Sequence, residues 1–225
     1  MINKMDRGLR KRLARFLGGR FPGIYSTLDY PMQVPVQVAA YKLALDQYLS
    51  PSDRILDVGF GLGYGLQLMS KKAAYLAGVD IDPKAVKAAQ KLVGVTPGLQ
   101  ELCIYNGKLL PYQQASFDVV TCVDVIEHVP DYRGLLEEML RVAARLVFVS
   151  TPNRRPEYTL PNGKPKNFWH LREWSYEEFD LILRQLQQIQ VEWNFLDGPW
   201  EGPFQTSQVI SAATQALTPV LIKKL

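Results

Sequence analysis

Four glycines occupy alternate positions after an apolar run that contains an acid. Residues 55–58 read Ile-Leu-Asp-Val, and the glycines that follow are Gly59, Gly61, Gly63 and Gly65. Glycine tolerates positive φ angles and lets a ligand approach the backbone without a Cβ in the way. A loop of this kind between a strand and a helix lies at the carboxyl edge of a parallel sheet, where open α/β folds bind their ligands. The pattern therefore predicts a ligand-binding bend directly after Asp57.

The spacing of these glycines separates two kinds of cofactor loop. A dinucleotide-binding loop needs the pattern G-x-G-x-x-G. Counted from Gly59, Tyr64 stands where the third glycine should be, and counted from Gly61, Leu66 stands there. The sequence instead reads D-x-G-x-G-x-G, which disfavours a dinucleotide as the ligand.

A cluster of acids with a histidine follows a later apolar run. Asp124, Glu127 and His128 form the pattern D-x-x-E-H, and the second of the chain's two histidines is His170. An imidazole titrates near neutrality, so His128 is our first candidate for a general base and His170 the second, with Glu127 beside them. The same carboxylates and imidazoles suit a divalent cation, which is the alternative. In a third interpretation the acids only cap and orient the following helix.

Apolar segments alternate with amphipathic segments between residues 36 and 150. The expected strands cover residues 54–58, 75–79, 102–105, 117–123 and 145–150, and the expected helices cover residues 36–49, 65–72, 83–93 and 132–143. Continuous apolar strands between amphipathic helices predict an α/β fold with a parallel sheet covered on both faces. A further helix is expected over residues 175–188, capped by Ser175, before a terminal antiparallel hairpin that begins at residue 189 and turns at residues 197–199.

These motifs, in this order, resemble those of class I S-adenosylmethionine-dependent methyltransferases. The glycine loop resembles the family's first motif, and residues 78–82 (Gly-Val-Asp-Ile-Asp) resemble its second-strand motif. Residues 106–112 resemble its G-D-A-x-x-L-P-F segment, and residues 116–120 resemble its entry to the fourth strand. The resemblance covers residues 53–151. It implies a Rossmann-like, mostly parallel sheet of seven strands with helices on both faces, and S-adenosylmethionine as the cofactor.

The resemblance also implies how the cofactor is held. Asp57 would hold the cofactor's ammonium group, directly or through water, and the glycines would give backbone access. Asp80 would accept hydrogen bonds from both ribose hydroxyls. The family usually has Asp where this chain has Asn106, whose carbonyl can still accept a hydrogen bond from the adenine amino group. The full set of expected cofactor residues is Asp57, Gly59, Gly61, Gly63, Asp80, Ile81, Asn106, Gly107 and Asp124.

The acid–histidine cluster has a resemblance of its own. Its D-x-x-E-H pattern is similar to the E-x-x-E-H of ubiquinone-type O-methyltransferases and small-RNA 2′-O-methyltransferases. In those enzymes the acids and the histidine bind a divalent ion that orients the acceptor oxygens. The first acid of this chain is Asp, one methylene shorter. The implied metal ligands are Asp124, Glu127, His128 and His170. We favour the base over the metal.

The loop over residues 151–174 is expected on the acceptor side. Residues 150–154 and the His-x-Arg-Glu-Trp stretch resemble methyltransferases of glycan and lipid biosynthesis, which implies that residues 151–153 line the acceptor pocket. The aromatic side chains expected in its wall are Phe168, Trp169 and Trp174, although Trp174 and Trp193 fit a local core better. Arg172 and Glu173 either pair with each other or contact the glycine loop. The expected reaction is O-methylation of a small-molecule, glycan or lipid-linked acceptor. The alternatives are an RNA 2′-O-methyltransferase that uses a divalent metal and a catalytically silent interaction domain.

The positive charge of the chain is concentrated at its start. The net charge is +4, but residues 1–20 hold seven basic residues against one acid, so the remainder is slightly acidic. This distribution disfavours a nucleic acid partner for the main domain. Residues 5–17 have the spacing of a basic amphipathic helix, which either packs on the domain or contacts an anionic membrane surface. We expect residues 1–35 to form this helix and a linker, and residues 36–225 to form the methyltransferase domain.

The cysteines and the hydropathy pattern bear on the compartment. Cys103 and Cys122 are the two cysteines, and both lie in apolar runs that are expected to be strands. No run of 18 apolar residues occurs in the sequence. Two buried thiols are typical of a reducing compartment. We therefore expect a cytoplasmic protein, with peripheral contact at the inner membrane surface through residues 1–20.

Overall fold

The computed structural model describes residues 34–94, 98–199 and 201–224. The basic amphipathic helix expected over residues 5–17 lies outside these ranges. The described helices are α2 (Pro35–Gln47), α3 (Tyr64–Met69), α4 (Pro83–Val93), α5 (Tyr132–Val142) and α6 (Tyr176–Leu183). The described strands are β1 (Arg54–Val58), β2 (Tyr75–Asp80), β3 (Leu99–Ile104), β4 (Phe117–Val123), β5 (Ala143–Pro152), β6 (Ile189–Asp197), β7 (Gln205–Ser207) and β8 (Thr214–Lys223).

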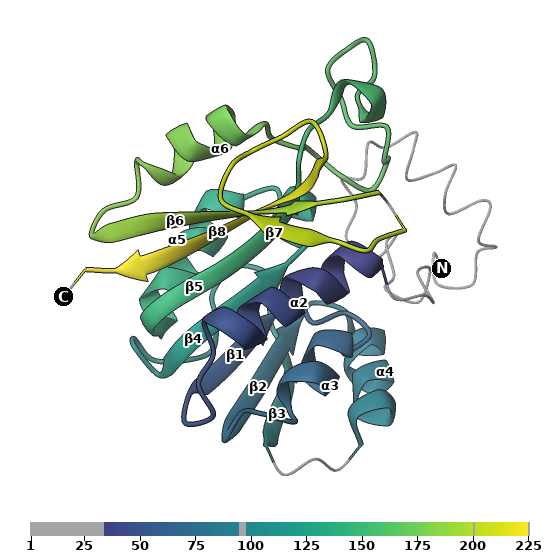
Figure 1. Cartoon of the computed structure of the whole chain (residues 1–225). Coiled ribbons are helices and arrows are strands. Elements are labelled where there is room, and N and C mark those ends of the chain that lie inside the picture. Colours follow the sequence, from purple (N-terminus) through teal and green to yellow (C-terminus); the bar gives the residue numbers. More distant parts are fainter. Residues whose placement is uncertain (1–33, 95–97, 200, 225) are drawn as a thin grey trace.

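The described strands form one sheet in the order β3-β2-β1-β4-β5-β8-β6-β7 (Figure 1). Strands β1 to β5 pair in parallel, while β8, β6 and β7 pair antiparallel at one end. The expected α/β fold, mostly parallel with an antiparallel end, is confirmed. The described part of the sheet has eight strands, whereas seven were expected. The additional strand is β7, which pairs with the end of β6 before the chain returns as β8, so residues 197–199 do not form a tight hairpin turn.

Helices cover both faces of the sheet because successive strand residues point to opposite sides. On β1, Ile55 packs into a cluster with α2, α3 and α4, whereas Leu56 packs into a cluster with α5 and α6. Figure 1 shows α2, α3 and α4 together on one side of the strands. Four of the five β1 residues are buried, as expected for a central parallel strand.

Side-chain caps begin three of the helices. Asp82 caps α4 by accepting a hydrogen bond from the Lys84 N–H, and Ser175 and Glu178 form the expected capping box of α6. Asp131 caps α5 in the same way through the Gly134 N–H. Helix α6 ends at Leu183, five residues earlier than expected, and turns lead from there into β6.

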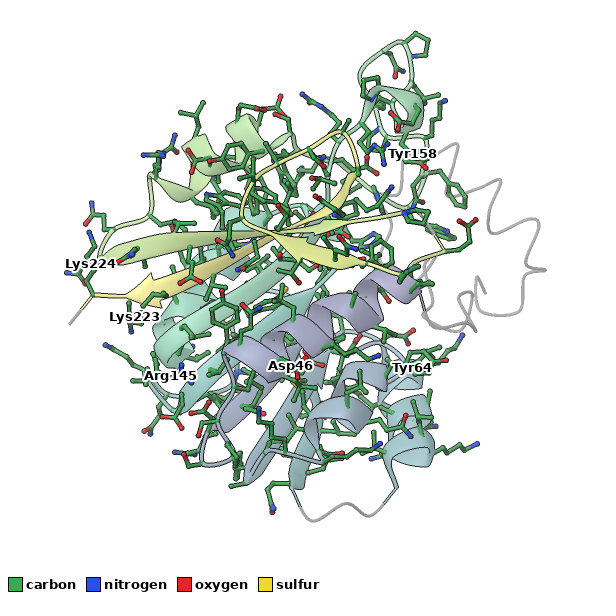
Figure 2. All side chains as sticks on the ribbon, viewed as in Figure 1. Asp46, Tyr64, Arg145, Tyr158, Lys223 and Lys224 are labelled. Carbon is green, nitrogen blue, oxygen red and sulfur yellow. The ribbon has the colours of Figure 1, made fainter. Side chains whose placement is uncertain are left out.

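The parallel strands bring the predicted motifs to one edge. Strand β1 lies between β2 and β4, and β4 pairs with β5, so the carboxyl ends of all four strands meet at the same side of the sheet. The loop after β5 carries Tyr158 and projects beyond this edge (Figure 2). No described helix is long and apolar enough to cross a bilayer.

Candidate functional site

The glycine loop adopts a bend that other residues would not tolerate. Gly59, Gly61 and Gly63 all have positive φ angles, of 74°, 56° and 89°. A Cβ on Gly59 would lie 2.5 Å from Cγ2 of Val125, and one on Gly63 would lie 2.8 Å from Cβ of Ala89. The loop is therefore packed on both sides as well as bent, which explains why glycine is needed at these positions.

Asp80, at the end of β2, fastens this loop to the sheet. Its two carboxylate oxygens accept hydrogen bonds from the Gly61 N–H and the Asp82 N–H, both at 2.9 Å. Burial raises the pKa of the Asp80 carboxyl, while these backbone donors oppose the rise. A carboxylate oxygen can accept more than one hydrogen bond, so the group retains capacity for a diol.

Asp57 lies beneath the loop and is fully buried. Thr121 donates a hydrogen bond to Oδ1 at 2.7 Å, and the Tyr41 hydroxyl lies 3.2 Å from Oδ1 and 3.1 Å from Oδ2. Burial raises the pKa of Asp57 to about 7, although both hydrogen bonds lower it. Tyr41 comes from α2, and nothing in the sequence motif pointed to it.

The segment expected to face adenine is organised by its own backbone. Oδ1 of Asn106 accepts hydrogen bonds from the N–H groups of Lys108 and Leu109, at 2.9 and 3.0 Å. The contact of this carbonyl with the adenine amino group stays a prediction, and the structure shows that the carbonyl also holds a turn. Ile81 lies beside Gly107 and exposes 57% of its surface. An apolar side chain this exposed at the carboxyl edge of the sheet offers a face for a flat ring.

Asp124, directly after β4, has a strained backbone. Its φ angle is +52°, which is uncommon outside glycine. The Ser150 hydroxyl donates to its Oδ1 at 2.8 Å, and its own N–H donates to the Ser150 carbonyl at 3.0 Å. Burial raises the pKa of the Asp124 carboxyl, and hydrogen bonds from Ser150 and Gln37 lower it. A non-glycine residue in this region costs about 1–3 kcal/mol, a strain that often occurs at functional sites.

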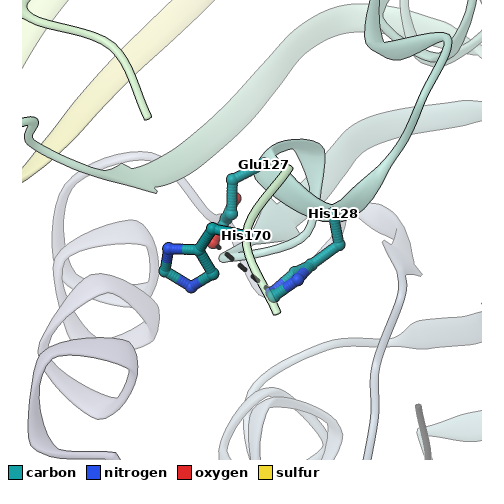
Figure 3. Close-up of side chains that lie close together, drawn as sticks. All are labelled: Glu127, His128 and His170. Atoms are coloured by element: carbon teal, nitrogen blue, oxygen red, sulfur yellow. Dashed lines mark ion pairs between the residues drawn. The ribbon is translucent and has the colours of Figure 1, made fainter. Parts of the chain in front are cut away.

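Glu127 has a buried oxygen that lacks a hydrogen-bond partner among the residues that the structure describes. The residue lies in a short turn, Ile126–His128, and its side chain is fully buried. Thr151 donates to Oε2 at 3.2 Å, but no described residue donates to Oε1. Burial and the nearby Asp124 raise the pKa of Glu127 well above its usual value. Oε1 lies 3.8 Å from Nε2 of His128 (Figure 3).

The loop after β5 sets the tautomer of His128. Nδ1 of His128 lies 2.9 Å from the Trp169 carbonyl, which can only accept, so Nδ1 carries the proton and Nε2 carries a lone pair. Burial, together with the smaller effect of nearby His170, lowers the pKa of His128 to about 4, so the imidazole is neutral at pH 7. The side chain still exposes 25% of its surface.

His170 is the third member of the cluster and packs edge-on against His128, with ring centroids 4.9 Å apart (Figure 3). Its Nδ1 lies 2.5 Å from Oε1 of Glu173, and its Nε2 lies 2.8 Å from Nδ2 of Asn167. Asn167 accepts the Trp169 N–H through Oδ1, so its amide group donates to His170. Glu127, His128 and His170 offer ligand atoms that all lie within 4.8 Å of one another. The fold thus brings together histidines that are 42 positions apart.

The structure also places the other residues that the sequence assigned to the acceptor side. Arg172 pairs neither with Glu173 nor with the glycine loop: it donates to the Val129 carbonyl at 2.8 Å and lies over the Tyr132 ring. Trp174 and Trp193 stack on Phe179 and Phe195, as the core interpretation predicts. Tyr41, Asn167 and the contact between Glu173 and His170 were not predicted from the sequence. Only the His-x-x-Glu spacing offered a signal, for Glu173.

Comparisons with known proteins show similarity to methyltransferases. A family model described as "Methyltransferase domain" matches residues 56–146. The ubiquinone biosynthesis O-methyltransferase of Albidiferax ferrireducens is 37% identical over 131 residues, which cover 54% of this chain and 50% of that protein. The chain therefore spans about half the length of the curated relatives it matches.

Solved structures resemble this chain over most of its length. YcgJ from Bacillus subtilis has a TM-score of 0.64 and 18% sequence identity, with 84% of this chain and 99% of that chain covered. A Thermotoga maritima S-adenosylmethionine-dependent methyltransferase, described as a possible histamine N-methyltransferase, has a TM-score of 0.63 and 20% identity, with 97% of each chain covered. At these identities the likeness concerns the fold alone.

Proposed function

We propose that the chain is a class I S-adenosylmethionine-dependent methyltransferase that O-methylates a small, lipid-like acceptor, because residues 56–146 match a methyltransferase domain. One observation carries the proposal: a glycine bend fastened by Asp80 lies at the same sheet edge as a neutral His128. The ubiquinone biosynthesis O-methyltransferases among its relatives support a lipid-like acceptor over a polymer.

The residues at the sheet edge suit the parts of the cofactor. The Asp80 carboxylate can accept hydrogen bonds from the ribose hydroxyls, and the exposed face of Ile81 suits adenine. Gly59, Gly61 and Gly63 allow close approach of the methionine part, near the acids Asp57 and Asp124. S-Adenosylmethionine supplies a methyl group already activated on a sulfonium, so the protein chiefly has to align the reactants.

His128 is the candidate general base for the acceptor hydroxyl. The methyl–oxygen bond forms as the methyl–sulfur bond breaks, and the hydroxyl proton passes to Nε2. The Trp169 carbonyl holds the tautomer that this transfer needs, and the partly exposed ring can reach a substrate. Glu127, 3.8 Å away, can stabilise the imidazolium that results.

One observation favours a second candidate, in which the cluster holds a divalent cation. Oε1 of Glu127 is buried and accepts no hydrogen bond from residues 34–94, 98–199 or 201–224, and a carboxylate oxygen of Glu127 lies within 4.8 Å of a ring nitrogen of each histidine. Glu127 and His128 fit a cation directly, whereas His170 would have to exchange its contact with Asn167 for the ion. A bound cation would orient the acceptor oxygens and favour loss of the hydroxyl proton.

The assay that tests the proposal is methyl transfer from labelled S-adenosylmethionine into membrane lipid, glycan and RNA fractions. We expect label in an organic-soluble product. Label in RNA would favour the 2′-O-methyltransferase alternative, and no calorimetric binding of the cofactor or of S-adenosylhomocysteine would favour a silent domain.

His128→Ala distinguishes the base from a binding residue. We expect methyl transfer to fall about 10²- to 10⁴-fold, the usual worth of a general base. The dissociation constant for S-adenosylhomocysteine should stay within about threefold, because His128 lies outside the glycine loop. Equal losses of transfer and binding in a folded protein would contradict the role.

Chelation separates the base from the cation. If His128 acts as a base alone, EDTA leaves the rate unchanged, and Glu127→Gln lowers it modestly. If the cluster holds a cation, EDTA abolishes transfer and Mg²⁺ or Mn²⁺ restores it, whereas in Glu127→Gln neither ion restores it.

A further inference from the structure

Helix α2 inserts a tyrosine under the glycine loop. The Tyr41 side chain exposes only 6% of its surface, and its hydroxyl lies 3.1–3.2 Å from both oxygens of Asp57. The helix runs beside α3 on the same face of the sheet (Figure 1). Tyr41 thus reaches the buried acid from outside the segment that carries the methyltransferase motifs.

The absence of a side chain on Gly65 makes room for the Tyr41 ring. A Cβ on Gly65 would lie 2.1, 2.3 and 2.6 Å from Cζ, Cε1 and Cε2 of Tyr41. Gly65 therefore leaves the space that the ring fills at the start of α3. Burial raises the pKa of the Tyr41 phenol well above its usual value, so the hydroxyl keeps its proton and can donate.

Tyr41 and Thr121 divide the hydrogen bonds of Asp57 between them. Thr121 donates to Oδ1 only, and among the residues that the structure describes Oδ2 accepts a hydrogen bond from Tyr41 alone. Without this hydroxyl, Oδ2 would be buried with no donor, a costly state for a carboxylate. The group would then turn or take up a proton.

We propose that Tyr41 is a positioning residue for the cofactor, which fixes the Asp57 carboxylate beneath the glycine loop to serve the cofactor's amino acid end. This inference rests on the proposed use of S-adenosylmethionine. The ribose end is held independently, because Asp80 is fixed by the backbone N–H groups of Gly61 and Asp82. Loss of the Tyr41 hydroxyl should therefore affect one end of the ligand and spare the other.

Two product-like ligands allow the binding of the amino acid end and of the ribose end to be measured separately. S-Adenosylhomocysteine carries the amino acid group, and 5′-methylthioadenosine lacks it but keeps the ribose and adenine. For Tyr41→Phe in the full chain, calorimetry at about pH 8, where Asp57 is mostly ionised, should show S-adenosylhomocysteine bound about 10- to 100-fold more weakly, the usual cost of a hydrogen bond to a charged group. The affinity for 5′-methylthioadenosine should stay within about twofold.

Tyr48→Phe is the matched control. Tyr48 follows the same helix, and its hydroxyl also hydrogen-bonds in the protein, to Glu192 and Asn194, away from the loop. This variant should bind both ligands like the wild type. As a second measurement, Tyr41→Phe added to Asp57→Asn should cause no further loss for S-adenosylhomocysteine, because the carboxylate is already gone.

Three results would overturn the inference. Tyr41→Phe could bind S-adenosylhomocysteine as tightly as the wild type does. It could weaken both ligands equally, which would indicate a purely structural role. It could also have its full effect in the Asp57→Asn background. If the wild type binds neither ligand, the proposed function itself fails. This outcome is distinct from the three results above, which compare variants of a protein that binds the ligands.

Discussion

The carboxyl edge of the sheet has two halves: the glycine-loop half, with Asp57 and Asp80, and the histidine half, with Glu127 and the two histidines. They differ in whether the oxygens of their buried acids accept hydrogen bonds. At the glycine loop, every carboxylate oxygen of Asp57 and Asp80 accepts a hydrogen bond from a hydroxyl or a backbone N–H. At the histidine cluster, Glu127 buries one oxygen that no residue in the described part of the chain hydrogen-bonds, and Asp124 holds a positive φ angle. Among the described residues, the hydrogen bonds of the first half are complete, whereas the second half leaves one buried acceptor atom open.

This difference indicates which half recognises a fixed ligand. A loop tied down by backbone hydrogen bonds and tight packing is organised before anything binds, as suits a cofactor shared by a whole family. An unsatisfied buried acid costs about 1–3 kcal/mol or more, and such costs persist where function uses them. The histidine half therefore gains most from an incoming acceptor or cation.

The largest predicted effect concerns Asp57 and pH. The folded chain keeps the Asp57 proton up to about pH 7, whereas the unfolded chain releases it near pH 3.8, so the folded state binds more protons between these values. The free energy of unfolding should therefore fall as pH rises through this window, by about 4 kcal/mol from this group. Urea unfolding of cofactor-free Asp57→Asn should lack this contribution. A pH dependence parallel to that of the wild type would contradict the burial cost.

A smaller effect compares two glycines with positive φ angles. Gly63 packs against Ala89, whereas a Cβ on Gly94 would meet nothing within 4 Å. Both alanine substitutions incur backbone strain, but only Gly63→Ala also overpacks the loop, at an extra cost of about 1–3 kcal/mol. We expect Gly63→Ala to unfold at lower urea and to lose affinity for S-adenosylhomocysteine. Equal stabilities of the two variants would mean that the loop is less tightly packed than its geometry indicates.

The smallest effect concerns the contacts that hold the histidine half together. Arg172 donates to the Val129 carbonyl and lies 4.8 Å from the Tyr132 ring centroid, so Arg172→Ala should lower the free energy of unfolding by about 1 kcal/mol. Affinity for S-adenosylhomocysteine should not change, because these contacts lie in the other half. Arg133→Ala is the control, because Arg133 also approaches Tyr132 but hydrogen-bonds to Gln185 at the surface. A loss of cofactor affinity in Arg172→Ala would show that the halves are coupled.

Much of the glycine-loop half could be predicted from the sequence because its causes are local. The positive φ angles follow from glycines in a short bend, and Asp80 follows one strand later at the same edge. The helix caps at Asp82 and Ser175 were also predicted, since a cap acts within one turn.

The assignment of Asn106 to adenine stays a prediction, and the structure adds that its carbonyl also accepts hydrogen bonds from the N–H groups two and three residues ahead. The main omissions came from contacts between distant segments, which no local pattern encodes. Tyr41 and Asn167 do not belong to any motif recognised in the sequence. The eighth strand, β7, was missed because three residues with little hydrophobic alternation give no periodic signal.

The sequence by itself determined the fold class, the glycine bend and the acid at the end of the second strand, because strand alternation and glycine φ preferences act over a few residues. Only the tertiary structure decided which side chains complete each site. The Trp169 carbonyl sets the tautomer of His128, Glu173 holds His170, and Tyr41 reaches Asp57 from a helix outside the motifs. Each of these hydrogen bonds depends on packing between segments, and the energy of such packing cannot be read from neighbouring residues.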